Sequence, residues 1–160
     1  MILLDTNVVS AVMQIRPEPD VVAWLDQQAP EQIWLPSLVV FELRYGLALL
    51  EPSTRRRRLE EGLERLLEEI VQERIAPLNT LAAEHAAELA THRKRKGSPV
   101  DLRDTLIAGI ALATGAALAT RNLKHFKDLP IPVLNPFQRK IGCPPQLPEG
   151  AATPQPPPTT

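Results

Sequence analysis

The sequence predicts an α/β fold, in which short buried strands alternate with amphipathic helices. Three apolar runs, over residues 2–4, 33–35 and 117–120, are too short to be helices and end in polar or turn-forming residues. Between them, apolar side chains recur at the spacing of one helical face. Since strands that alternate with helices pair in parallel through crossover connections, we expect a parallel sheet flanked by helices.

The first strand leads directly into an acidic turn. It ends at Asp5, which opens the run Asp5-Thr6-Asn7, three residues of the kind that cap helices. A helix over residues 8–13 is expected to follow, and prolines end it. The next amphipathic helix covers residues 20–28, with Asp20 as its expected N-cap.

The middle of the chain carries the second strand and two long helices. Pro36 closes the strand, and Ser37 is expected to cap a helix that runs to about residue 50. A longer helix is expected from Ser53 to about residue 73, because leucines recur along it at helical spacing while charges fill its other faces.

The last elements return the chain to the sheet. Residues 75–78 form a weak strand or connector, and a helix is expected over residues 80–96. Asp101 caps a further helix, which ends at Gly115 just before the third strand. Residues 131–134 can add only an edge strand, since their prolines lack the N–H groups that a sheet interior requires.

The chain divides into one folded domain, residues 1–140, and a proline-rich C-terminal tail, residues 141–160. With 44% hydrophobic and 23% charged residues, the 160-residue chain has the composition of an ordinary globular domain. The tail has almost no apolar side chains to anchor it, so we expect a flexible extension.

Composition also indicates the cellular environment. Cys143 is the only cysteine, so no intrachain disulfide can form, which fits a reducing cytoplasm. The N-terminus lacks the basic and apolar regions of a signal peptide, and no apolar run approaches the roughly 20 residues of a membrane span. We therefore expect a soluble cytoplasmic protein without membrane contact.

Acidic residues fall where the sheet should bind ligands. Ligands of parallel α/β sheets bind beyond the carboxyl ends of the strands, and both Asp5 and Asn122 follow strands directly. Glu42 lies within the first two turns of the helix after the second strand, and Asp104 lies in the first turn of the helix before the third. Each of the last two borders an apolar face, where a charge must be paired, hydrated or bound to metal.

Carboxylates gathered at one place repel one another unless a cation neutralises them. Mg²⁺ and Mn²⁺ suit such oxygen-rich sites, and the bound ion can activate water and stabilise charge on phosphate oxygens. Zinc-ligand spacing, a glycine-rich phosphate loop and a nucleophile elbow are all lacking in this sequence. Each acid also has a structural interpretation: Asp5 as a helix cap, Glu42 paired with Arg44 or Arg103, and Asp104 stabilised by the helix dipole.

Four sequence segments resemble the motifs of PIN-domain toxins of the VapC type, including the FitB-like subgroup. They are MILLDTNVVS at residues 1–10, PSLVVFELRYG at 36–46, DTLIAGIA at 104–111 and ATRNLKHF at 119–126. Each motif is short, but together they occur in the family's order over about residues 1–137. The resemblance implies a three-layer α/β/α PIN-like domain with a short parallel sheet.

The resemblance also implies a function. It predicts a Mg²⁺- or Mn²⁺-dependent endoribonuclease, the toxin of a type II toxin–antitoxin module. Its partners would be RNA, a small DNA-binding antitoxin and a second copy of the chain, with operator DNA bound only through the antitoxin. The alternatives are a DNA nuclease of the same fold, or a weakly catalytic partner of the antitoxin in operon repression.

The family's site residues can be carried over by position. Asp5, Glu42 and Asp104 become the catalytic metal ligands, and Asn122 becomes a fourth catalytic residue. Three further residues would position substrate or water at the strand ends: Thr6, Asn7 and Thr120.

Two neighbouring acids have other interpretations, and Asn122 is a departure from the family pattern. FitB-like members often carry an aspartate at that position, and a neutral Asn weakens the case for a second metal ion. Asp128 is interpreted as the cap of the Leu129-Pro130 turn. Asp101 is interpreted as an N-cap, with a role in the site as the alternative.

Two basic clusters are candidates for contact with RNA, although the net charge of −1 argues weakly against a nucleic-acid binder. Residues 92–96 precede the loop that leads to Asp104, so they form the better-placed patch, whereas residues 55–58 are interpreted as a solvated helix start. Four residues inside apolar patterns are expected in the core: His85, Trp24, Trp34 and Phe41. Extra apolar residues on the early helices could form a groove for a partner or a dimer face, with core burial as the alternative: Val8, Val9, Val12, Leu43, Leu47 and Leu50.

Overall fold

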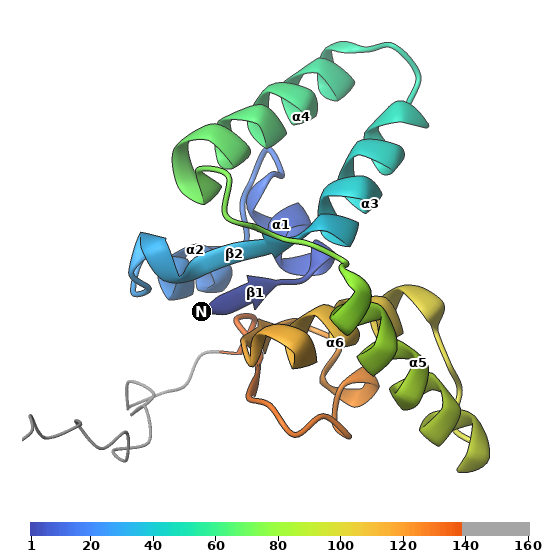
Figure 1. The fold of residues 1–160 in the computed structure, drawn as a ribbon. Helices are drawn as coiled ribbons and strands as arrows, with labels where there is room; N and C mark the ends of the chain where they lie inside the picture. The colour runs from blue at the N-terminus through green and yellow to red at the C-terminus, as the bar shows by residue number, and fades with distance from the viewer. Residues whose placement is uncertain (139–160) are drawn as a thin grey trace, which may run out of the picture.

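The computed structural model describes residues 1–138 (Figure 1). They form a three-layer α/β/α fold, as predicted, with a five-stranded sheet flanked by helices. The strands are β1 (Ile2–Leu4), β2 (Ile33–Pro36), β3 (Ile75–Ala76), β4 (Ala117–Ala119) and β5 (Val133–Leu134). The α-helices are α1 (Thr6–Val12), α2 (Pro19–Leu25), α3 (Ser37–Ala48), α4 (Thr54–Arg65), α5 (Thr80–Arg95) and α6 (Leu102–Thr114).

Shorter helical segments complete the chain. A 3-10 turn, η1 (Pro30–Gln32), precedes β2, and another, η3 (Leu123–His125), follows β4. The π-helical segment η2 (Leu66–Val71) continues α4, so this helical stretch reaches nearly as far as predicted. It ends at Gln72, whose φ of 48° is left-handed.

The sheet is parallel throughout, with strand order β3-β2-β1-β4-β5. Ile2 pairs with Ile33 on one side of β1 and with Ala117 on the other, which places β1 at the centre. β3 and β5 are the edge strands, in agreement with the short and proline-flanked sequences there. The carboxyl ends of β1, β2 and β4 therefore lie along one edge.

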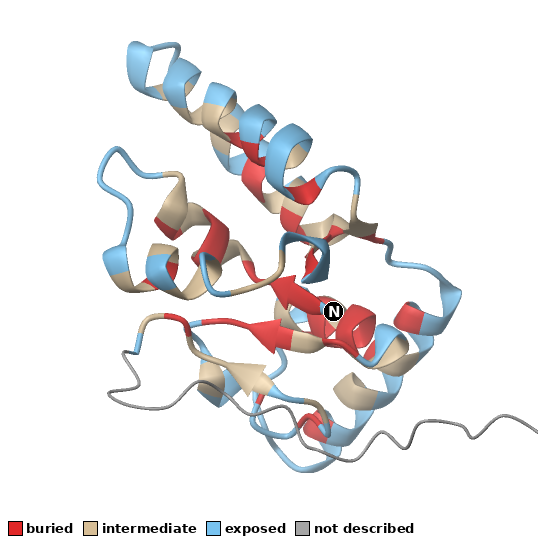
Figure 2. Cartoon of the chain, turned by 90° about the vertical axis from the view of Figure 1, so that its left-hand side faces the viewer, coloured by how far each residue is buried: buried red, intermediate tan, exposed pale blue. Residues whose placement is uncertain are grey.

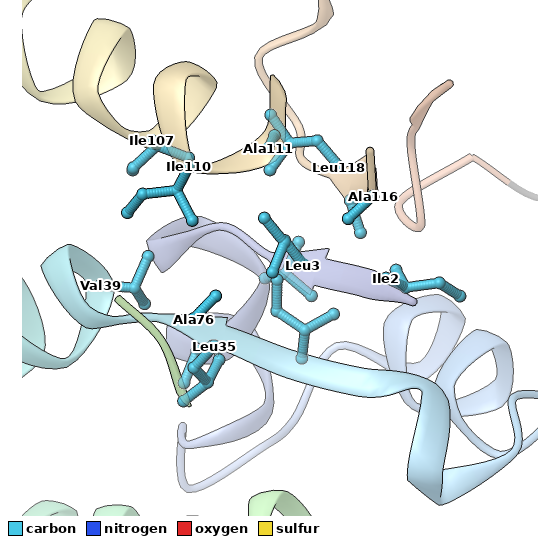
Figure 3. Packing of buried hydrophobic residues seen from close by; sticks show 14 of the residues in the cluster. Ile2, Leu3, Leu35, Val39, Ala76, Ile107, Ile110, Ala111, Ala116 and Leu118 are labelled. Carbon is cyan, nitrogen blue, oxygen red and sulfur yellow. The ribbon is translucent and has the colours of Figure 1, made fainter. Parts of the chain in front are cut away.

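The core is built from the strands and the helix faces that cover them (Figures 2 and 3). Leu3, Leu35 and Leu118 are fully buried, one on each of the three inner strands. Val8 and Val9 of α1 are also fully buried, so core burial and not a partner groove explains these two residues.

Helices α5 and α6 lie side by side, and their backbones approach each other closely (Figure 1). The contact depends on Gly109, because a Cβ placed there would lie 2.3 Å from the Ala82 carbonyl oxygen and 2.7 Å from the Ala86 Cβ. Glycine is thus needed at this position to let the two backbones approach.

Two predicted helix caps are wrong. The N-cap of α2 is Glu18 and not Asp20, because Pro19, whose ring presets the helical φ, occupies the first helical position. Ser37 is the first residue of α3 and not its cap, which is Pro36. The Ser37 hydroxyl instead accepts a hydrogen bond from the Leu78 N–H at 3.0 Å, and so ties α3 to the segment after β3.

Two residues predicted to lie in the core, Phe41 and His85, are not buried. Phe41 is 58% exposed and stacks on Tyr45 with 5.7 Å between ring centroids. His85 is partly exposed, 3.9 Å from Glu88. Both belong to helices whose apolar residues extend beyond the buried face, so periodicity alone does not distinguish them, whereas Trp24 and Trp34 do pack against the core.

The C-terminal tail predicted for residues 141–160, with Cys143, lies outside the described residues. Within residues 1–138, no helix has the length and apolar character needed to cross a membrane.

Candidate active site

Asp5 stands at the carboxyl end of the central strand and caps the helix that follows. Its N–H donates to the Ala119 carbonyl at 2.9 Å, which extends the β1–β4 ladder by one residue. Its Oδ1 accepts a hydrogen bond from the Thr6 N–H at 2.7 Å, the N-cap interaction predicted for this turn. The residue is only 4% exposed, so a carboxylate is held almost entirely away from solvent.

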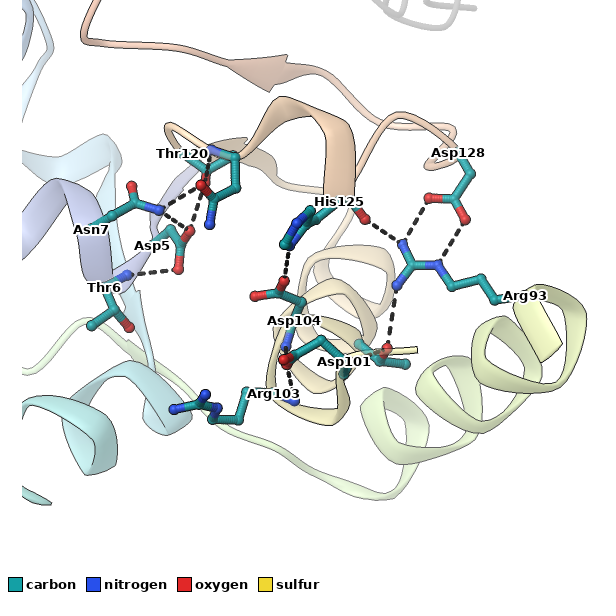
Figure 4. Close-up of polar contacts among 12 residues, drawn as sticks. Asp5, Thr6, Asn7, Arg93, Asp101, Arg103, Asp104, Thr120, His125 and Asp128 are labelled. Carbon is teal, nitrogen blue, oxygen red and sulfur yellow. Dashed lines mark hydrogen bonds and ion pairs between the residues drawn. The ribbon is translucent and has the colours of Figure 1, made fainter. Parts of the chain in front are cut away.

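The other carboxylate oxygen of Asp5 is fixed by two side chains. Oδ2 accepts hydrogen bonds from the Thr120 hydroxyl and from the Asn7 Nδ2, each at 2.6 Å (Figure 4). Asn7 also ties the start of α1 to the segment after β4, since its Oδ1 accepts from the Arg121 N–H at 3.0 Å. Three residues predicted to position substrate therefore surround Asp5 and set its orientation.

Glu42 reaches the same place from α3. The Thr6 hydroxyl donates to the Glu42 carboxylate. Arg103 Nη1, at the start of α6, lies 3.5 Å from Glu42 Oε1, which is one of the two pairings considered for this acid. With a side chain 14% exposed, Glu42 is buried enough for its charge to act on its neighbours with little screening.

Asp104 completes the acidic group from the first turn of α6. Asp101 is the N-cap, as predicted, and its Oδ1 accepts from the N–H groups of Arg103 and Asp104 at 2.9 and 3.1 Å. This cap fixes the first turn, from which the Asp104 side chain points toward the side where Asp5 lies (Figure 4). The Asp104 carboxylate is paired with the Nδ1 of His125.

The three carboxylates share one electrostatic environment. Burial raises the pKa of Asp5 most strongly, and its hydrogen bonds from Thr120 and Thr6 oppose that rise. Repulsion from Asp104 and from Glu42 raises the pKa of Asp5 further. An arrangement that concentrates negative charge around a desolvated carboxylate is one that a bound cation would stabilise.

Comparison with known proteins relates this geometry to a family. The family model described as PIN domain matches residues 2–131. The chain belongs to the PIN-domain family. Among curated relatives, the plasmid stability protein StbB of Pseudomonas syringae pv. tomato is 37% identical, the VapC ribonuclease Y4jK of Sinorhizobium fredii is 33% identical and the toxin FitB of Neisseria gonorrhoeae is 35% identical. Each match covers 86% of this chain and 99% of the relative.

Solved structures agree with this assignment. The chain is similar to the structure of FitAcB from Neisseria gonorrhoeae, with a TM-score of 0.79 and 34% identity over 87% of this chain and 100% of that chain. It is similar to a structure of FitAB bound to an IR36 DNA fragment, with a TM-score of 0.79 and 33% identity over 88% and 98% of the two chains. These likenesses support the FitB-like subgroup that the motifs indicate.

The donor set of this PIN domain fits a hard divalent cation. Within residues 1–138, no three acidic, imidazole or thiol side chains converge closely enough to ligate one ion together. Mg²⁺ does not require three, because it is usually held by one or two carboxylates and keeps several waters. Asp5 retains acceptor capacity beyond its three hydrogen bonds, since a carboxylate offers about four lone-pair sites.

Asn122 lies beside the three acidic residues, next to Thr120, and is exposed. Its N–H donates to the Thr120 hydroxyl oxygen at 3.0 Å, while its side chain makes no hydrogen bond with any residue of the described chain. The amide is thus free to contact a ligand, but it adds no charge to the PIN-domain site.

Sequence reasoning missed His125, which pairs with Asp104. A signal was present, because His125 follows Asn122 by three residues in the fourth motif, the spacing of one 3-10 turn. The side chain is 54% exposed, so it covers the outer side of Asp104 without sealing it from solvent.

Sequence reasoning also misplaced Arg93 and Asp128. Asp128 does not cap the Leu129-Pro130 turn; its two oxygens accept hydrogen bonds from Arg93 Nε and Nη2 at 2.8 and 2.7 Å. These bonds lower the pKa of Asp128, against a smaller rise from burial. Arg93 also donates to the His125 carbonyl at 2.7 Å and the Thr105 hydroxyl at 3.2 Å, so it is buried and cannot serve the RNA-facing patch predicted for residues 92–96.

Proposed function

We propose that this protein is a divalent-metal-dependent endoribonuclease and the toxin of a type II toxin–antitoxin pair. The observation that carries the proposal is the buried Asp5 carboxylate at the end of β1, repelled by Glu42 and Asp104. Relatives that match across nearly their whole length are named as a VapC ribonuclease and as the toxin FitB.

Asp5 and Asp104 would hold Mg²⁺ or Mn²⁺ directly, and Glu42 would bind or orient the attacking water. When bound, such an ion supplies an activated water at neutral pH and offsets the charge that develops on phosphate oxygens. The exclusion of solvent from Asp5 supports this assignment, because charges interact more strongly away from water.

The remaining residues of the site would orient these groups. Thr6 connects the two inner acids, since its N–H donates to Asp5 and its hydroxyl donates to Glu42. Asn7 and Thr120 hold the second oxygen of Asp5, which fixes the direction of its remaining lone pairs. Asn122 and Thr120 would position a water molecule or a phosphate oxygen, and the unpartnered Asn122 amide supports this role.

The partner would be a small DNA-binding antitoxin, which would carry the complex to operator DNA. The similar solved structures include FitAB bound to a DNA fragment, which supports this assignment. A second copy of the chain is also proposed as a partner. Phe41 and Tyr45 of α3, and Leu49 directly after it, expose 58%, 56% and 68% of their surfaces, and this apolar stripe supports contact with another chain.

The test is cleavage of matched single-stranded RNA and DNA oligonucleotides by antitoxin-free protein, with Mg²⁺, with Mn²⁺ and with EDTA. We expect RNA alone to be cut, and only when a divalent ion is present. Cleavage of DNA instead would favour the alternative of a DNA nuclease with this fold. An inert preparation that still tightens operator binding by the antitoxin would favour the weakly catalytic repressor partner, for which the neutral Asn122 is the supporting observation.

A further inference from the structure

A basic pocket adjoins the acidic site on the outer side of Asp104. It has a volume of about 420 Å³ and is lined by the C-terminal end of α5, the loop before α6, the first turn of α6, and η3 with the segment that follows it. Asp104 and His125 belong to its wall, so the pocket is continuous with the proposed catalytic edge.

The cations of this pocket are of two kinds. Arg93 is already engaged in the fold, because it donates hydrogen bonds to Asp128, Thr105 and the His125 carbonyl. Lys96, Lys124 and Lys127 are exposed, and no ion pair or hydrogen bond engages their ammonium groups within residues 1–138. Three lysines without carboxylate partners therefore face one concave surface.

The carboxylates of the pocket are each already engaged. Asp128 is paired with Arg93, Asp104 is paired with His125, and Asp101 accepts two backbone N–H groups as a helix cap. Four permanent cations line the pocket against these three carboxylates, so it carries net positive charge although the whole chain carries −1. A cation held at Asp104 would make the pocket more positive still.

We propose that this pocket is a subsite for a backbone phosphate of the RNA strand, next to the phosphate at which the strand is cut. The inference rests on the proposed ribonuclease function. A strand whose scissile phosphate lies at Asp5 and Asp104 must continue past the acidic site, and the pocket that the lysines line includes Asp104 but not Asp5. Lysine ammonium groups bind phosphates as point charges without reading bases, so the subsite would add affinity and register but no sequence preference.

The first arm of the test compares a Lys96→Gln/Lys124→Gln double variant with the wild-type protein. The matched control is Arg16→Gln/Arg65→Gln, which removes the same number of exposed charges from outside the pocket and outside both basic clusters. We expect the double variant to raise KM for RNA roughly tenfold at low salt while kcat stays within twofold, and the control to behave as wild type. Equal melting temperatures of the three proteins show that the fold is kept.

The second arm removes the charge from the RNA. Once the cleavage position is mapped, oligonucleotides with a single neutral methylphosphonate linkage on the 5′ or 3′ side are compared with the all-phosphate RNA. One of the two modified oligonucleotides should bind the wild-type protein and the control more weakly than the all-phosphate RNA does. For that oligonucleotide, the slope of log K against log salt concentration should be smaller in magnitude by about 0.7. That oligonucleotide should lose nothing further in the Lys96→Gln/Lys124→Gln variant.

The inference is overturned if the double variant and the control bind and cleave RNA alike, or if the effects of the neutral linkage and of the lysine substitutions simply add. Failure of the proposed function looks different, because then the wild-type protein itself leaves RNA uncut with Mg²⁺ and Mn²⁺. In that case the pocket is no substrate subsite either, and the inference fails together with the function.

Discussion

Two arginine–carboxylate pairs of similar geometry occupy opposite surroundings in this molecule. Arg93 and Asp128 lie between α5 and the segment after η3, where the arginine side chain is 6% exposed and their N–O distance is 2.7 Å. Arg44 and Glu64 join α3 to α4 at 2.8 Å, with side chains 53% and 50% exposed. Figure 1 shows α3 and α4, here called the α3–α4 arm, extending away from the sheet, whereas α5 and α6 lie together on the opposite side of strands β1 and β2.

The two pairs differ in how many parts of the fold each arginine holds together. Arg93 makes four hydrogen bonds that connect α5, α6 and the segment carrying His125, and so it fixes the surroundings of Asp104. Within residues 1–138, Arg44 bonds only Glu64, and both side chains are about half exposed. A salt bridge on the α3–α4 arm therefore has little structural consequence, while the same chemistry beside α6 supports the proposed active site.

The largest expected effect is on activity. Asp104→Asn removes one carboxylate of the proposed metal site and should lower RNA cleavage by more than roughly 100-fold, because a residue that binds the metal directly matters at least as much as the residues that orient it. Glu64→Gln is the matched change on the α3–α4 arm and should leave the rate unchanged. Single-turnover cleavage assays check both, and wild-type activity in Asp104→Asn would remove this residue from the site.

The next effect is on stability. Arg93→Ala leaves the Asp128 carboxylate without its partner and the Thr105 and His125 oxygens without their donor. We expect a loss of about 3 kcal/mol in the free energy of unfolding. Arg44→Ala should have no measurable effect. Urea denaturation of the two variants tests the contrast, and equal losses would show that burial does not distinguish the two pairs.

A smaller effect is expected at the α5–α6 contact. Gly109→Ala forces a methyl group against the Ala82 carbonyl and should destabilise the protein by about 1–3 kcal/mol. Gly62→Ala lies on α4 with no atom within 4 Å of the added Cβ, and should stabilise it by about 0.5–1 kcal/mol. The melting temperature should therefore fall for Gly109→Ala and rise for Gly62→Ala. A shift of the same sign in both variants would contradict the close α5–α6 contact at Gly109.

The smallest effects concern pH. The pKa of Asp128 is lowered mainly by its hydrogen bonds with Arg93, so its stabilising contribution is complete above the ordinary carboxyl range of about 3.9 and is lost as the pH falls through the lowered value. The pKa of Asp5 is raised mainly by burial, so its contribution is present at low pH and is lost as the pH rises through the raised value. Carbon-13 NMR titration of EDTA-treated protein should place the two carboxyls on opposite sides of the ordinary value. The reverse order would contradict these burial and pairing assignments.

Much of the fold could be predicted from the sequence because local and global preferences agree. The strands are short apolar runs, and the strong caps Asp101 and Gly115 mark both ends of α6. The edge strands follow from their prolines and short length. Periodicity failed where a helix carries more apolar residues than it can bury, as Phe41 shows on α3.

The acidic residues were predictable because their positions depend only on strand ends and helix starts. The surrounding network was not, because it depends on which distant side chains meet. Arg93 and Asp128 are 35 residues apart, and a run of five basic residues gives no indication that its second member is buried. His125 could have been found from its spacing after Asn122, but its contact with Asp104 requires the packing of η3 against α6.

The central claim is that Asp5, Glu42 and Asp104 form one metal site, and titration of Mn²⁺ followed by electron paramagnetic resonance tests it most directly. The wild-type protein should remove free Mn²⁺ in a saturable manner, Asp104→Asn should bind it at least roughly tenfold more weakly, and Glu64→Gln should bind as wild type does. Equal affinity in all three proteins, or no saturable binding by the wild type, would contradict the claim.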